Sequence, residues 1–198
     1  MNPIGVTTWL WTSPLSDADL ELLVPRVRDW GFDIIELPIE QLGDWTPAHA
    51  AALALGAGLS TTTCAVMTPD RDLTTPDRQV TQSTQAYVLA CVDIASTVGS
   101  PVVAGPMYAP VGRLWQLDAG ERRQTIARLV EHLRPVADYA GQNGVRLALE
   151  PLNRFETSLV NTVEQALEVV DGVDSPALGV LLDTFHMNIE EKDPAASA

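Results

Sequence analysis

The stretch VRLALEPLNRFET, residues 145–157, constrains the fold of this chain more than any other part of it. It opens as an apolar run typical of a strand that is covered on both faces, and Pro151 ends the strand directly after Glu150. Because side chains alternate along a strand, Arg146, Ala148 and Glu150 are expected on one face. Glu150 is then placed at the carboxyl end of a buried strand, where parallel α/β folds gather their functional groups.

A second apolar run, ALGVLLD at residues 177–183, ends in the same way, with Asp183 followed closely by His186. Two carboxylates and a histidine at the mouths of neighbouring strands predict a divalent-metal site, because these are the ligands that such ions take in proteins. Each residue also has a structural interpretation: Glu150 as an exposed loop carboxylate, Asp183 as a helix or loop cap, His186 as a packing residue. The cost of burying an unpaired charge favours the metal site.

Strand-like and helix-like segments alternate along the whole chain. Strand-like runs occupy residues 4–11, 33–37, 59–66, 102–105, 145–150 and 177–183. Helix starts are predicted from capping or proline signals at Ser16, Thr46, Pro76, Asp118 and Asn161. Six strands separated by five crossover helices predict an α/β fold with a parallel sheet. No linker or shift in composition divides the 198 residues, so one domain, residues 1–198, is expected.

Composition narrows the classes of partner. The chain is 46% hydrophobic and 19% charged, with a formal net charge of −14 and a single lysine, Lys192. This balance argues against nucleic acid and anionic membranes and favours a neutral molecule or a cation. Cys64 and Cys91 form no CxxC pair, which suits a reducing compartment. With neither a signal-peptide layout nor an apolar run of about 20 residues, a cytoplasmic protein with no membrane partner is expected.

Two motifs carry a resemblance to a known family. LALEPLNRFET at residues 147–157, followed by LLDTFHMNIEE at residues 181–191, resembles the ketose 3-epimerases, such as the D-tagatose and D-psicose 3-epimerases. These belong to the xylose isomerase-like TIM-barrel superfamily, and the resemblance extends from Ile4 to the last residues. It implies a (β/α)8 barrel, of which this chain supplies about the first six βα units.

The resemblance also implies roles for individual residues. Glu150 matches the family's metal-bound glutamate, which in addition moves the proton at C3 of the sugar. Asp183 matches a second metal ligand. His186 and Glu156 match groups that bind oxygens of the substrate, and Cys64 falls on a position that lines the substrate.

Five further residues are candidates for the surroundings of the site. Glu36, at the mouth of the second strand, is expected to be a neighbour of the metal site. Trp9, Trp11, Tyr108 and Trp115 are candidate walls for the face of a sugar ring, although aromatic residues more often belong to the core.

By the same resemblance, the site takes a divalent metal ion, with Mn2+ expected ahead of Mg2+ or Co2+. The family's two other metal ligands, a histidine and a glutamate that is the second acid–base group, come from strands seven and eight, beyond Ala198. A substrate-binding arginine comes from the same part. The implied function is a metal-dependent isomerase that interconverts ketoses at C3 through an enediolate, acting as a homo-oligomer.

Two alternatives stay open. One is another isomerase of the superfamily, of the hydroxypyruvate or inositol-pathway type, which would differ in its pocket but keep the metal motif. The other is an inactive, incomplete barrel that only binds a sugar or a partner chain. A DNA-repair endonuclease of the same fold is disfavoured by the acidic composition. Turnover of a sugar separates the first alternative from the second.

Overall fold

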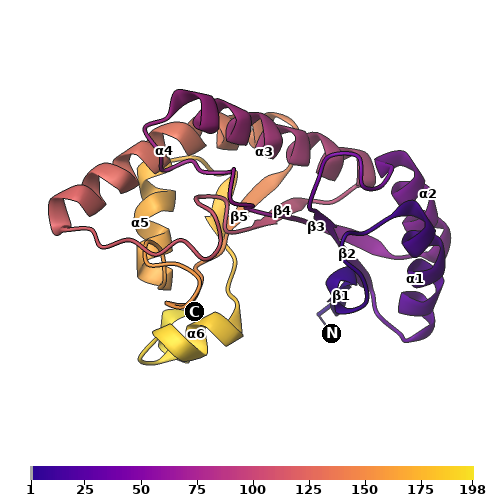
Figure 1. Cartoon of the computed structure of the whole chain (residues 1–198). Helices are drawn as coiled ribbons and strands as arrows, with labels where there is room; N and C mark the ends of the chain where they lie inside the picture. The colour runs from indigo at the N-terminus through magenta and orange to yellow at the C-terminus, as the bar shows by residue number, and fades with distance from the viewer. Residues whose placement is uncertain (1) are drawn as a thin grey trace.

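A single curved sheet of six parallel strands organises the computed structural model, which describes residues 2–198 (Figure 1). The strands pair in sequence order, each with the next along the chain, so β1 and β6 form the two edges. The strands are β1 (Gly5–Thr7), β2 (Ile34–Ile39), β3 (Ser60–Ala65), β4 (Val102–Gly105), β5 (Arg146–Leu149) and β6 (Leu178–Val180). The predicted α/β fold with six βα units is confirmed.

Helices cover the convex side of the sheet. Each of the first five helices contacts the next, so α1 to α5 form a continuous outer layer, while α6 lies below α5 near the end of the chain (Figure 1). The helices are α1 (Asp17–Asp29), α2 (Pro47–Ala57), α3 (Arg78–Val98), α4 (Ala119–Gln142), α5 (Val163–Val173), α6 (Thr184–Glu190) and α7 (Pro194–Ser197), with a 3-10 helix η1 (Thr8–Leu10). None of the helices described over residues 2–198 is long and apolar enough to cross a membrane.

Three predicted boundaries are corrected by local hydrogen bonds. The first strand stops at Thr7 because the Thr7 hydroxyl accepts a hydrogen bond from the backbone N–H of Trp9 and turns the chain into η1. The third helix begins after Asp77, which caps it, rather than at Pro76. The fifth helix is capped by Thr162, in a reciprocal pair with Gln165, rather than by Asn161.

Alternation along the strands separates the core from the site. The convex face carries apolar side chains that are fully buried against equally buried helix residues. These are Ile35, Leu37, Val103, Leu147 and Leu149 from the sheet and Leu20, Val88, Leu129, Leu133 and Val169 from the helices. On the concave face, Cys64, Ala104 and Ala148 lie side by side in register on β3, β4 and β5. The small side chains of this face leave room at the carboxyl ends of the strands.

Packing between the sheet and the helices should therefore dominate the stability of the chain. Replacing the fully buried Leu133 of α4 with alanine removes apolar contacts and leaves a cavity, so a loss of about 2–5 kcal/mol in the free energy of unfolding is expected. Leu55 of α2 is 83% exposed, and Leu55→Ala, its matched control, should change that free energy by less than about 0.5 kcal/mol. Urea unfolding followed by circular dichroism measures both. Equal effects of the two substitutions would contradict this assignment of the core.

Candidate active site

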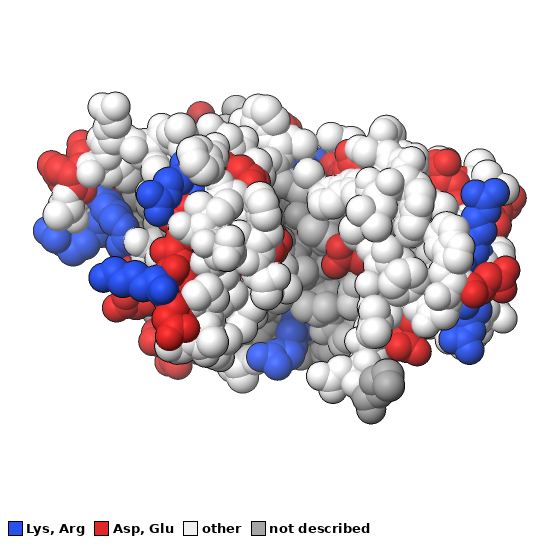
Figure 2. Space-filling view, turned by 90° about the horizontal axis from the view of Figure 1, so that it is seen from below, with Lys and Arg blue, Asp and Glu red and all other residues white. Residues whose placement is uncertain are grey.

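A pocket of about 280 Å³ opens at the carboxyl ends of the strands. It brings together four of the predicted site residues, namely Glu150, Glu156, His186 and Cys64, from β3, the loop after β5, and α6. The remaining lining residues are Trp9, Ala65, Val66, Met67, Pro106, Val111 and Leu152. Seen from below, the molecule is hollowed at its centre, with acidic side chains facing the hollow and most of the visible basic side chains toward the two ends (Figure 2).

Glu150, Asp183 and His186 form a compact cluster at the mouths of β5 and β6. One potential ligand atom from each residue lies within 4.8 Å of the other two. The Nε2 atom of His186 is 3.7 Å from Oε1 of Glu150 and 3.7 Å from Oδ2 of Asp183. The structure thus places these three predicted residues together, although they are 33 and 3 positions apart in the chain.

Local structure fixes both carboxylates. The backbone N–H of Glu150 donates to the carbonyl of Gly105 at 3.1 Å, which anchors the end of β5 beside β4. The predicted strand at residues 177–183 is too long, since β6 ends at Val180. Asp183 instead caps α6: its Oδ1 atom accepts a hydrogen bond of 2.7 Å from the backbone N–H of Phe185. This cap leaves Oδ2 facing His186.

The cluster carries negative charge without a cationic side chain to balance it. Burial, followed by repulsion from Asp183, Glu36 and Glu156, raises the pKa of Glu150 to about 7. In the part of the chain that the structure describes, neither Glu150 nor Asp183 forms a salt bridge with lysine or arginine. Two oxygen donors with uncompensated charge fit a hard divalent cation, so the residues present suit the metal that the sequence predicts.

Cys64 serves as part of the wall. Burial, with repulsion from Glu36 and Glu150, raises the pKa of its thiol well above the usual range. The thiol therefore stays protonated, and its Sγ atom lies 3.6 Å from the carbonyl of Ala65, to which it donates. A protonated, buried thiol is neither a nucleophile nor a metal ligand, so its contribution is to the shape of the pocket.

The loop after β5 holds Glu156 at the rim of the pocket. Oε1 of Glu156 accepts a hydrogen bond of 2.7 Å from Nδ2 of Asn153, and its backbone carbonyl accepts one of 2.7 Å from the N–H of Gly112. Sequence reasoning missed Asn153, which belongs to the same motif and is 2% exposed. The available signal was an asparagine in a tight turn between two candidate site residues, a position where the side-chain amide commonly binds its neighbours.

Only one of the four candidate aromatic walls lines this pocket. The indole N–H of Trp9 donates to Oε1 of Glu40 at 3.0 Å, which holds its ring at the mouth. Trp11 stacks on Trp30 instead, with ring centroids 5.2 Å apart. Tyr108 is fully buried, and Trp115 packs under the guanidinium of Arg113. Trp11, Tyr108 and Trp115 are therefore not among the residues that line the pocket. Glu36 is not among them either, but its charge contributes to the raised pKa of Glu150, and its own pKa is raised by burial.

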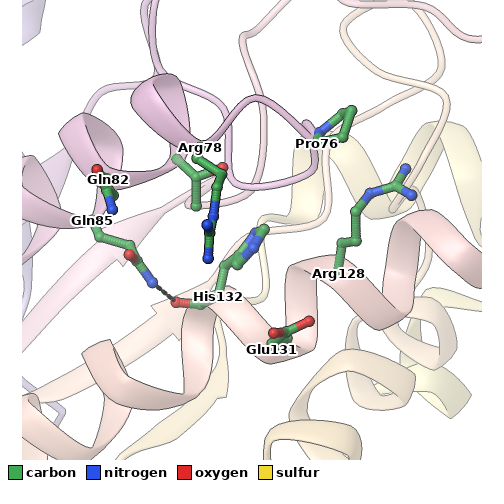
Figure 3. A pocket seen from close by; sticks show the side chains of 8 residues that line it. Pro76, Arg78, Gln82, Gln85, Arg128, Glu131 and His132 are labelled. Atoms are coloured by element: carbon green, nitrogen blue, oxygen red, sulfur yellow. Dashed lines mark hydrogen bonds between the residues drawn. The ribbon is translucent and has the colours of Figure 1, made fainter.

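A larger cavity, of about 450 Å³, lies between α3 and α4 on the outer surface (Figure 3). Two of its side chains, His132 and Arg128, hold the loop that precedes α3. Nδ1 of His132 lies 2.8 Å from the carbonyl of Leu73, and Nε of Arg128 donates to the carbonyl of Thr74 at 3.0 Å. Gln85 donates to the carbonyl of His132 at 2.7 Å. None of the residues that line this cavity belongs to the smaller pocket or to the cluster of Glu150, Asp183 and His186, so we assign the functional site to the smaller pocket.

A parallel sheet with an outer layer of helices and an acidic cluster at its carboxyl edge defines the (β/α)-barrel class. Residues 24–198 match the model of the xylose isomerase-like TIM barrel, and the chain belongs to that family.

Within this family, the chain is similar to proteins named as ketose 3-epimerases. The chain is 34% identical over 191 residues to a probable ketose 3-epimerase of Synechocystis sp., covering 96% of this chain and 65% of that protein. It is 33% identical over 193 residues to an L-ribulose 3-epimerase of Mesorhizobium japonicum, covering 98% and 64%. A solved structure of an L-ribulose 3-epimerase matches with a TM-score of 0.92 at 30% identity, over 100% of this chain and 65% of that one. The similarity to ketose 3-epimerases is confirmed, and the chain spans about two thirds of these relatives' length.

The raised pKa of Glu150 predicts how stability depends on pH in the metal-free protein. Between pH 4.5 and about 7 the folded state keeps a proton that the unfolded state has lost, so stability falls as pH rises through this range. The full cost, about 3 kcal/mol, is present above pH 7. Glu36 adds a change of the same sign.

Glu150→Gln should remove most of this loss. Urea unfolding in the presence of a chelator, at about pH 5 and about pH 8, measures it. Wild type should be less stable at the higher pH, and the variant should gain about 2–3 kcal/mol over wild type there but little at the lower pH. Glu131→Gln, on the exposed face of α4, is the control and should behave as wild type. A wild-type protein that gains stability toward pH 8 would contradict the assignment.

Proposed function

We propose that this chain carries the metal-binding and substrate-orienting part of a ketose 3-epimerase active site. The observation that carries the proposal is the cluster of Glu150, Asp183 and His186 within 4.8 Å, which lies beside a pocket of monosaccharide size. The relatives named as ketose 3-epimerases support the reaction class. The composition and the resemblance support a cytoplasmic homo-oligomer.

Glu150 and Asp183 would hold the divalent ion, with Mn2+ preferred over Mg2+ or Co2+. Both offer carboxylate oxygens, and Asp183 keeps Oδ2 available because only Oδ1 is used to cap α6. Such an ion, when bound, withdraws electron density from the ketose oxygens and so makes the hydrogen at C3 more acidic.

Glu150 is the group that moves the C3 proton. It lies at the carboxyl end of β5 and lines the pocket, so one of its carboxylate oxygens can reach a proton of a bound sugar. The C3–H bond breaks, the proton passes to an oxygen of Glu150, and the electron pair flows toward the C2 carbonyl to give an enediolate. Return of the proton to the same face restores the starting ketose. Return to the opposite face gives the epimer and requires a second acid, which we do not assign within residues 2–198.

The rest of the pocket orients a neutral sugar. His186 and Glu156 offer hydrogen bonds to hydroxyl and carbonyl oxygens, whereas Trp9 and Met67 supply apolar walls. None of the lining residues that this chain supplies is lysine or arginine, so its part of the pocket offers hydrogen bonds to sugar oxygens.

Hydrogen exchange at C3 tests the proposal directly. The 198-residue protein would be incubated with Mn2+ and a panel of ketohexoses in D2O, and deuterium at C3 followed by NMR. Exchange requires only one working base, so the residues of this chain are expected to support it. Glu150→Gln should slow exchange by at least about 100-fold, the usual contribution of a general base. Glu131→Gln should exchange as wild type does.

Two results would contradict the proposal. One is the absence of exchange with every ketose in a protein that binds Mn2+. The other is exchange that persists unchanged in Glu150→Gln.

A further inference from the structure

The buried side chain of Asn153 joins the two residues that face the substrate. Its Oδ1 atom accepts a hydrogen bond of 3.0 Å from the backbone N–H of Phe155. Its Nδ2 atom donates to Oε1 of Glu156 at 2.7 Å and lies 2.9 Å from Nδ1 of His186. The backbone N–H of Asn153 also donates to Nδ1 of His186, at 3.2 Å. Every polar atom of the side chain is therefore engaged.

These partners leave one orientation for the amide. The N–H of Phe155 can only donate, so it requires the oxygen of Asn153, whereas the carboxylate of Glu156 can only accept, so it requires the nitrogen. Both requirements agree. Nδ1 of His186 then faces two N–H donors and, among residues 2–198, no acceptor within hydrogen-bonding distance. It must act as an acceptor, which places the single proton of the neutral imidazole on Nε2.

The protonated nitrogen is the one that faces the carboxylates. Nε2 of His186 lies 3.7 Å from oxygens of both Glu150 and Asp183. A histidine that binds a metal through Nε2 has no proton there and donates from Nδ1 to an acceptor. His186 has the opposite arrangement. It presents an N–H donor to the site, suited to a sugar oxygen, and leaves the metal to the carboxylates.

We propose that Asn153 is a positioning residue that fixes the proton of His186 on Nε2 and holds Glu156 at the same time. The part of this proposal that concerns catalysis rests on the proposed function. Because one amide binds both residues, it also fixes their separation, with Nδ1 of His186 4.0 Å from Oε1 of Glu156. The two groups that would orient the sugar are thus held as one unit.

Two further contacts keep Asn153 and His186 together, although they lie on different elements. The backbone and side chain of Arg154 donate three hydrogen bonds of 2.7–2.9 Å to the carboxylate of Glu190 on α6. Oε1 of Glu191 accepts a hydrogen bond of 2.8 Å from the N–H of Val163, at the start of α5. The end of α6 is therefore joined both to the loop after β5 and to the start of α5.

The protonation pattern of His186 can be read without turnover. In protein carrying isotope-labelled histidine, a long-range proton–nitrogen correlation spectrum at about pH 8 distinguishes the two neutral tautomers of each ring. The chain has only three histidines. His132 is an internal reference, because its Nδ1 atom donates to the carbonyl of Leu73 and it should show the Nδ1–H form. His186 should show the Nε2–H form. A spectrum with His186 in the Nδ1–H form would overturn the proposal.

The substitution Asn153→Asp distinguishes the contact that the side chain makes with His186 from the contact that the backbone N–H makes. The aspartate keeps an acceptor for the N–H of Phe155 but offers no donor to His186, so the Nδ1–H fraction of His186 should rise. Asn143→Asp, an exposed position after α4, makes the same chemical change and should leave the spectrum as in wild type. An unchanged His186 signal in Asn153→Asp, with the His132 signal intact, would overturn the role of the side chain. Loss of the His132 signal would mean that the variant is unfolded. The wild-type spectrum, with His186 in the Nε2–H or the Nδ1–H form, would then decide whether the proposal stands.

Kinetics connect this arrangement to catalysis. Asn153→Asp should slow C3 exchange about 10- to 100-fold, the range usual for residues that orient groups at a metal site, with Mn2+ affinity unchanged. If wild type shows no exchange, the proposed function fails while the tautomer is still measured. If wild type exchanges but Asn153→Asp exchanges equally fast, only the catalytic part of the proposal for Asn153 fails.

Discussion

The register of the parallel sheet is the constraint on which the rest of this molecule depends. Because β1 to β6 pair in sequence order, alternate side chains lie on two faces of the sheet, one that packs against the helices and one that leads to the site. One face carries Leu147 and Leu149 into the layer beneath the helices, and the other carries Ala148 toward the concave side, with Glu150 at its end. A shift of one residue in β5 would exchange these sets, exposing the core and burying the acid beneath the helices.

The same register creates an electrostatic cost. It brings Glu36, Glu150 and Asp183 toward one space, where burial and mutual repulsion raise the pKa of Glu150 to about 7. In residues 2–198 no lysine or arginine pairs with Glu150 or Asp183, so the helix layer and the core must stabilise the fold against this repulsion. The clustered carboxylates lower the stability of the folded protein but favour the binding of a cation. A loss of stability of this kind is common at functional sites.

Hydrogen bonds in the loop after β5 fix the orientation of the polar side chains beside these carboxylates. The amide of Asn153 has a single permissible orientation, and through it the loop assigns different tasks to neighbouring groups. By distance alone, Glu150, Asp183 and His186 could form a three-ligand metal centre. The hydrogen bonds of Asn153 instead support our proposal that the two carboxylates would bind the metal while His186 would donate a hydrogen bond.

The sequence by itself determined the order of strands and helices, the strand-end position of Glu150 and the two motifs that indicate the family. These features are local, because apolar periodicity, caps and a proline after a strand act within a few residues. It did not determine that β6 stops at Val180, or that Oδ1 of Asp183 accepts a hydrogen bond from the backbone N–H of Phe185 and so caps α6. The tertiary structure alone decided which aromatic ring reaches the pocket and which nitrogen of His186 carries the proton. Both depend on contacts between residues far apart in the chain, Trp9 with Glu40 and Asn153 with His186, which no local pattern encodes.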